Sequence, residues 1–305
     1  MKKSFVIILS VCCLLNFSCS KPEHYSAKEE VNNETVLKSY TLSKAITDYD
    51  AYLLNHKLPK QNQQVLGTIE TLLDYALADG ASAWTVFKVA SKFVGVGYGA
   101  AIGMLGGICG SLYEYIRNNY DFKLPRTTQN INAFDIEENI VSNPMNAYTQ
   151  YSYSFVGQLH NLYLDSAIYK IENGQMGFSA SETYAYLVSK ASVEFEIPAD
   201  SLVVKFPFSE YQKIIDDNVG SLSALEINNL TLSDSIPSYL CDYMNEFFTR
   251  VRNPENADYD VAINYANLFI ADAETQVGFT QMERNAIQYS LSIFKQSLLY
   301  WSSKL

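Results

Sequence analysis

Few side chains in the sequence are suited to acid–base or metal chemistry. Histidine occurs at positions 24, 56 and 160 only. His24 lies in a polar N-terminal stretch, so a multi-histidine zinc site is not expected. His160 is in line with Val156 and Leu164 at helical spacing, which favours a hydrogen-bonded core histidine. The other interpretation is a functional histidine acting with its neighbour Asn161.

Sequence signatures of catalysis are missing. The chain contains no HExxH, no CxxC, no phosphate-binding loop and no GxSxG. Paired carboxylates occur at Glu137–Glu138 and Asp216–Asp217, but a solvated helix face or a helix cap explains them as well as a glycosidase pair does. We therefore predict that the protein is not an enzyme, and we expect no cofactor and no metal.

Charge and aromatic content limit the classes of partner. The formal net charge is −11, which argues against nucleic acid, because binding to phosphates depends on Lys and Arg. The chain has 23 tyrosines. In a helical protein these line the rim of the core, or they form a surface that contacts a protein or a glycan.

The N-terminus predicts export. Lys2 and Lys3 precede an apolar run from Phe5 to Leu15, which is too short to span a bilayer and is typical of a signal peptide. Ser18 then stands directly before Cys19. One interpretation of this pattern is an ordinary secretory signal in which Cys19 has no special role. Beyond Cys19 the chain has two cysteines, Cys109 and Cys241, which is too few for a disulfide framework.

The segment "NFSCS" resembles the lipobox of bacterial lipoproteins, and its Phe-Ser-Cys form is similar to lipoproteins of the Bacteroidetes. The resemblance implies removal of residues 1–18 by cleavage before Cys19, diacylglycerol on the Cys19 sulfur and an acyl chain such as palmitate on its amine. It also implies an outer-membrane lipoprotein, facing either the periplasm or the exterior.

Hydrophobic periodicity divides the mature chain. Residues 19–33 are polar and predict a flexible tether, and residues 34–120 form an N-terminal helical region. In that region Asp79-Gly80 is expected to end a helix. Residues 121–150 lack any period and predict an irregular connection, and residues 151–305 form a C-terminal helical domain.

Cap patterns place several helix ends in the C-terminal half. Ser179 and Glu182, like Thr280 and Glu283, match the capping box. Asn253-Pro254 is expected to end the helix before it. Strand-like alternation is limited to two short stretches near residues 150 and 204. The predicted fold class is therefore all-α, a multi-helix bundle with a glycine-rich apolar helix or hairpin.

The glycine-rich stretch from Phe93 to Tyr113 has no charged residue. A stripe at Gly95, Gly99, Gly103 and Gly107 would let another helix approach closely, as a glycine zipper does in lipid. Glycine also weakens a helix by about 1 kcal/mol relative to alanine. A buried helix inside the fold is the favoured interpretation, and a membrane-associated segment is the alternative.

Three Asp-Ser-apolar tripeptides resemble the O-glycosylation signal of Bacteroidetes proteins. Their acceptor residues are Ser166, Ser201 and Ser235. Asp-Ser before a helix is also ordinary N-cap chemistry, so the resemblance leaves both interpretations open.

The mature chain also resembles uncharacterised Bacteroidetes proteins with a glycine zipper, an LHN helix and a C-terminal Ser-x-x-Tyr-Trp. Here these are Gly95–Gly110, Leu159–Asn161 and Ser297–Trp301. That family has no assigned activity. We therefore expect a lipid-anchored envelope lipoprotein that acts as a helical interaction module for an unknown protein or glycan. The alternative function is a membrane-active, bacteriocin-like protein whose zipper inserts and oligomerises.

Overall fold

The structure is a computed structural model that describes residues 40–56, 63–94, 96–118, 153–177, 179–212, 237–253, 255 and 257–304. Helices are the only regular elements in these ranges, which confirms the all-α prediction. Lys38–Leu305 form one compact unit, and the described parts of both predicted helical regions share its hydrophobic core. The helices are α2 (Lys44–Asn55), α3 (Gln63–Val94), α4 (Val96–Asn118), α5 (Tyr153–Glu172), α6 (Ala180–Glu194), α7 (Ala199–Lys205), α9 (Ser238–Arg252), α10 (Tyr259–Thr275) and α11 (Gln281–Ser302).

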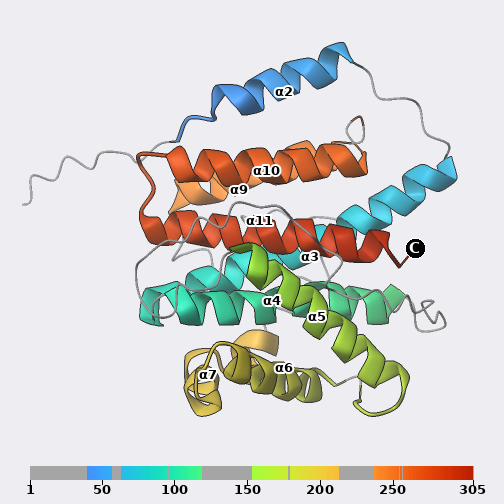
Figure 1. The fold of residues 1–305 in the computed structure, drawn as a ribbon, viewed down its shortest axis with the longest axis vertical. Helices are drawn as coiled ribbons and strands as arrows, with labels where there is room; N and C mark the ends of the chain where they lie inside the picture. The colour runs from blue at the N-terminus through green and yellow to red at the C-terminus, as the bar shows by residue number, and fades with distance from the viewer. Residues whose placement is uncertain are drawn as a thin grey trace, which may run out of the picture. The chain divides into compact units, whose positions relative to one another are not determined.

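Helix α11 lies at the centre of this unit. It packs against α3, α5 and α10, and α2 lies on the far side of α10 (Figure 1). The residues of the apolar face of α11 are Ile287, Leu291, Phe294, Leu298 and Trp301. This apolar face is buried throughout, and so are Ser290, Ser292 and Ser297 on the other faces of the helix. Small side chains on those faces let neighbouring helices approach α11 from several directions.

Helix α3 does not end at Asp79-Gly80, so that prediction is wrong. The helix continues to Val94. A Cβ atom at Gly80 would lie 2.9 Å from the Cβ atom of Phe294, so glycine serves here for close packing against α11. Asp79 is buried and its carboxylate bonds to other helices rather than capping its own. Packing therefore overrides the local stop signal.

The predicted caps at Ser179 and Thr280 and the helix end at Asn253 are confirmed, whereas Ser209, predicted to cap a helix before Tyr211, lies inside a helical turn that includes Phe208. Ser179 caps α6 by accepting a hydrogen bond from the Glu182 backbone N–H. Thr280 and Glu283 form a complete capping box at the start of α11. Asn253 is the C-cap of α9. These signals succeed because each bond joins residues at most four positions apart.

The glycine-rich helix α4 is buried inside the unit from Gly99 to Leu112. It packs along α3, and it also contacts α5, α6 and α11. Within the described residues, no helix combines the length and the hydropathy that a membrane span needs.

Buried tyrosines predict a loss of stability in alkali. Burial raises the pKa of Tyr184 and of Tyr289 to about 12. Their neutral forms stabilise the fold fully below the unfolded-state pKa near 10, and this contribution is lost as pH rises toward the folded-state pKa. The free energy of unfolding should fall by at least about 2 kcal/mol between pH 9 and pH 11, because burial also raises the pKa of other tyrosines, including Tyr243 and Tyr300.

Urea titrations at pH 9 and pH 11 measure this change directly. Tyrosinate absorbance at 295 nm serves as the control, since the folded chain at pH 11 should show less tyrosinate than the urea-unfolded chain. Equal unfolding free energies at the two pH values would contradict the prediction.

Candidate functional site

A buried carboxylate joins four helices at the centre of the core. Asp79 of α3 accepts the backbone N–H of Ser111 of α4 at 2.6 Å and the hydroxyl of Ser297 of α11 at 2.5 Å. His160 of α5 places Nε2 3.2 Å from Oδ2 of Asp79. The side chains of Asp79 and His160 have no exposed surface. We call this arrangement the Asp79 node.

The second ring nitrogen of His160 connects the Asp79 node to Asn161 and, through Asn161, to the backbone of α11. Nδ1 lies 3.0 Å from Oδ1 of Asn161, and Nδ2 of Asn161 donates to the backbone carbonyl of Gln296 at 2.7 Å. An amide oxygen only accepts, so Nδ1 carries a hydrogen in this arrangement. Nε2 is close enough to Asp79 for an ion pair, although its direction does not fit a hydrogen bond.

The node contains aspartate, histidine and serine, but not in the order of a hydrolytic triad. In a triad the histidine lies between the acid and the nucleophile and takes the serine proton. Here the Ser297 hydroxyl and His160 Nε2 both contact Oδ2 of Asp79, so the hydroxyl points to the acid. This geometry ties helices together and does not activate a nucleophile.

Glycines of α4 make room for the node. A Cβ at Gly107 would lie 3.1 Å from Cδ2 of His160, and one at Gly110 would lie 2.6 Å from the carbonyl oxygen of Ala78. Of the predicted zipper residues, Gly99, Gly103 and Gly107 are buried and Gly95 lies outside the described residues. Gly106 and Gly110, next to the predicted stripe, also approach α3 closely, with added Cβ atoms 2.5 Å from Val86 Cγ2 and 2.6 Å from the Ala78 carbonyl oxygen.

The predicted modification sites fall in different environments. Ser166 is half-buried on α5 and its hydroxyl accepts a hydrogen bond from Tyr186 at 2.6 Å, which a glycan at that oxygen would displace. Ser201 is half-buried in α7. Ser235 and the lipidation site Cys19 lie outside the described residues.

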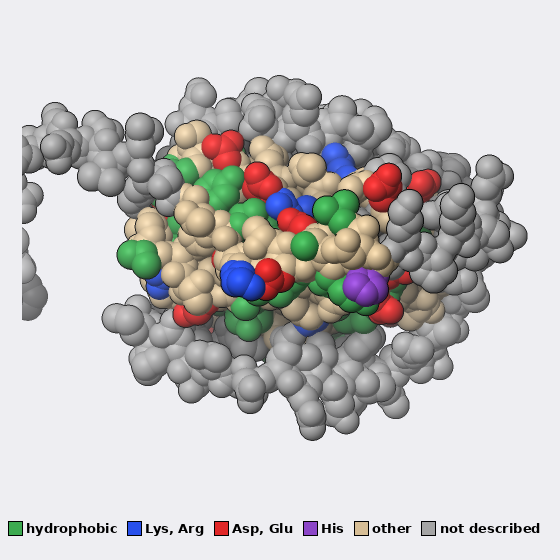
Figure 2. Space-filling model, turned by 90° about the horizontal axis from the view of Figure 1, so that it is seen from above, with side chains coloured by type: hydrophobic (Ala, Val, Ile, Leu, Met, Phe, Trp, Pro, Cys, Tyr) green, Lys and Arg blue, Asp and Glu red, His purple; other side chains and the backbone are tan. Residues whose placement is uncertain are grey.

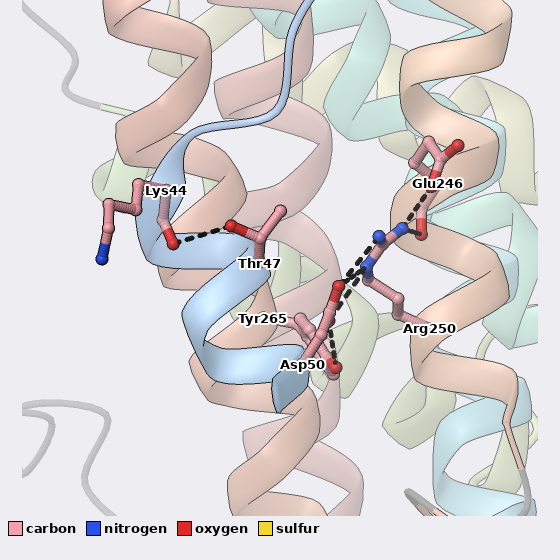
Figure 3. Close-up of polar contacts among 6 residues, drawn as sticks. All are labelled: Lys44, Thr47, Asp50, Glu246, Arg250 and Tyr265. Carbon is pink, nitrogen blue, oxygen red and sulfur yellow. Dashed lines mark hydrogen bonds and ion pairs between the residues drawn. The ribbon is translucent and has the colours of Figure 1, made fainter. Parts of the chain in front are cut away.

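A second polar cluster lies near the surface between α2, α9 and α10. The Arg250 guanidinium of α9 donates to both carboxylate oxygens of Asp50 of α2, at 3.0 to 3.2 Å, and it also pairs with Glu246. Tyr265 of α10 donates its hydroxyl to Asp50 at 2.8 Å. Figure 3 shows Arg250 between the two carboxylates. We call these four residues the Asp50 clasp.

Burial and the neighbouring carboxylates set the protonation states of Arg250 and Tyr265 in the clasp. Burial lowers the pKa of Arg250, but its hydrogen bonds to Asp50 and Glu246 outweigh this and raise the pKa overall. Burial, and then the bond to the Asp50 carboxylate, raise the pKa of Tyr265 above its usual value. Arg250 therefore stays cationic and Tyr265 stays a donor near neutral pH.

The N-terminus of α2 is held by a second carboxylate. Asp272 of α10 accepts the Ser43 backbone N–H at 2.8 Å, the Tyr243 hydroxyl at 2.8 Å and the Gln276 amide at 2.9 Å. Gln276 also donates to the Thr41 carbonyl at 2.7 Å. The Ser43 side chain makes no cap bond, so a carboxylate from α10 complements the dipole of α2. We call this the Asp272 clasp.

Three aromatic rings follow one edge of α2. Tyr49 packs edge-on against Tyr265 at 5.1 Å and its hydroxyl accepts from Asn264. Tyr52 is parallel to Tyr49 at 6.2 Å, and His56 stacks on Tyr52 at 4.3 Å. Tyr52 is 53% exposed. We call Tyr49, Tyr52 and His56 the aromatic row.

The face that carries α2 mixes several kinds of side chain. Figure 2 shows acidic and hydrophobic side chains interspersed with a few basic ones over its described part. Asp258 and Asp260 lie near enough to contribute to the raised pKa of Tyr49, after the larger effect of burial. This surface offers aromatic rings beside hydrogen-bond acceptors, which is a chemistry of binding.

Sequence reasoning missed both clasps. The missed residues are Asp50, Glu246, Arg250, Tyr265 and Asp272. A signal existed for Asp50, which comes four positions after Ile46 and three before Leu53 and so places a charge on the helix face that these two buried residues form. Its partner could not be found by spacing, because Arg250 is 200 positions away.

Neither the geometry nor comparison assigns a chemical activity. Within the described ranges, no three His, Cys, Asp or Glu side chains come together as metal ligands would. No protein-family model matches the chain, and neither a curated protein nor a solved structure matches it.

Proposed function

We propose that the protein is a lipid-anchored lipoprotein of the outer membrane whose helical unit is a binding module for a protein or a glycan. The lipobox-like "FSCS" at Cys19 supports the anchor. The observation that carries the binding role is the aromatic row, whose central ring is 53% exposed on the first described helix after the N-terminal segment.

The aromatic row has the features of a recognition surface. Aromatic side chains provide large contact area with few rotatable bonds, so ordering them on binding costs little entropy. Stacking between Tyr52 and His56 further limits their motion. Nearby carboxylates of Asp258 and Asp260 would accept hydrogen bonds from sugar hydroxyls or from cationic side chains.

Truncation of the central ring tests the role of the row. Tyr52→Ala should weaken partner binding by about thirtyfold, which is the usual effect of removing a central aromatic anchor. The free energy of unfolding should change by no more than about 0.5 kcal/mol, since Tyr52 is a surface residue. Tyr169→Ala on α5 is the matched control, because Tyr169 is also an exposed tyrosine.

A site-specific photocrosslinker identifies the partner class. Placed at position 52 in intact cells, it should give a protein adduct if the partner is a protein, and a glycan array probed with the mature chain should give a hit lost in Tyr52→Ala if it is a glycan. Val193 on α6 is 73% exposed and provides the control position. Equal adducts from both positions, with no Tyr52-dependent glycan hit, would refute this use of the row.

The anchor is tested separately. Cells that express the full chain and are labelled with a palmitate analogue should yield a labelled protein in the membrane fraction. Cys19→Ala should remove the label and release the chain from that fraction, because the acyl chains provide the attachment. An unlabelled wild-type chain would end the lipoprotein proposal and leave the binding role to be judged on its own.

The membrane-active alternative makes a different demand on the molecule. Helix α4 would have to exchange its packing against α3 and α11 for contact with lipid, and Asp79 would lose the Ser111 backbone N–H that it accepts. Liposome dye release by the purified mature chain is the test. Release at micromolar concentration would favour the alternative over the binding module.

A further inference from the structure

We propose that α2 is a strap that opens from α9 and α10 as a unit while the rest of the helical unit stays folded. The strap is Tyr40–His56, the first stretch of the chain that the structure describes. Residues 57–62, which follow it, lie outside the described ranges. The proposal rests on how α2 is attached and is independent of what the aromatic row binds.

The apolar attachment of α2 is small. Ile46 and Leu53 are its only buried residues, and Leu54 is 76% exposed. Helix α11, in contrast, is buried along nearly its whole length. Because hydrophobic stabilisation scales with buried apolar area, removing α2 from the unit loses far less of it than removing α11 would.

Polar contacts provide much of the remaining attachment. The Asp50 clasp fixes the middle of α2, and the Asp272 clasp fixes its N-terminus. Arg250 is 19% exposed and Asp50 is 28% exposed, so water can replace part of their interaction when the helix leaves. Arg250 keeps Glu246 as a partner on its own helix in the open state.

The surface under α2 is also suited to opening. Tyr40 packs edge-on against Tyr243 at 5.3 Å, and Tyr49 packs against Tyr265 at 5.1 Å. Opening therefore uncovers Tyr243, Tyr265 and the Asp272 carboxylate, together with the surface that buries Ile46 and Leu53. Tyrosine and aspartate tolerate water better than the buried Phe, Ile and Leu side chains that make up much of the core.

Opening would change the reach of the chain. The helix of 12 residues is about 18 Å long. A detached helix of 12 residues is marginal in water, so Tyr40–His56 can unwind once α2 has opened, and fully extended it would span about 55 Å. In combination with the proposed lipid anchor, the strap would let the remaining bundle move further from the membrane without unfolding.

Hydrogen–deuterium exchange of the full mature chain tests the strap. The amides of α2 should exchange about a hundredfold faster than those of α11, with a smaller dependence on urea, because a local opening exposes less surface than global unfolding. Asp50→Asn should accelerate exchange in α2 about tenfold and leave α11 unchanged. Ile46→Ala should accelerate it about thirtyfold or more.

Asp48→Asn is the matched control. The Asp48 side chain is on the same helix and is 61% exposed, and it pairs with the exposed Lys44 of α2 itself. Its substitution should leave α2 exchange within about twofold. The proposal is overturned if α2 and α11 exchange at one rate with one urea dependence, or if Asp50→Asn accelerates both helices equally.

Discussion

Asp79→Ala should lower the free energy of unfolding by about 3–5 kcal/mol, because it removes a buried carboxylate on which groups from three other helices converge. The side chain has no exposed surface, and its carboxylate contacts Ser111, His160 and Ser297 from three other helices. After substitution, the Ser111 N–H and the Ser297 hydroxyl would be buried without the carboxylate that accepts them. Urea denaturation followed by circular dichroism gives the value.

Two further variants keep this prediction measurable if Asp79→Ala does not fold. Ser297→Ala removes one hydrogen bond to the same carboxylate and should cost about 1.5–3 kcal/mol. Lys44→Ala breaks an exposed ion pair on α2 and should cost no more than about 0.5 kcal/mol. A loss below 1 kcal/mol for Asp79→Ala would mean that the node does not hold the helices together.

Gly110→Leu should destabilise the protein by more than about 3 kcal/mol through overpacking between α4 and α3. A Cβ at this position would lie 2.6 Å from the carbonyl oxygen of Ala78 and 2.8 Å from its carbonyl carbon. These are backbone atoms, so relief requires a shift of one whole helix. Gly110→Ala should also destabilise, although the better helix propensity of alanine offsets about 1 kcal/mol of the effect.

Gly177→Ala is the control for this series. Its Cβ would meet only the end of the Glu182 side chain, which can move aside, so the expected change is within about 0.5 kcal/mol. Thermal and urea unfolding of the three variants give the comparison. An unchanged stability for Gly110→Leu would contradict a packing role for this glycine and would favour a role outside the folded unit.

The sequence by itself predicted features that depend on neighbouring residues. The all-α class followed from hydrophobic periodicity, and the starts of α6 and α11 followed from their caps. These predictions succeeded because a cap bond joins residues three positions apart and a helical stripe repeats within one turn. Both are set by local geometry and are only weakly affected by the rest of the chain.

Contacts distant in sequence were decided by the tertiary structure. Asp79-Gly80 carries a local stop signal, yet α3 continues, because Gly80 packs against Phe294 and Asp79 bonds to α4 and α11. Likewise, the partner of Asp50 is 200 positions away. A side chain's pattern indicates that it needs a partner, but only the packing of helices determines which group becomes that partner.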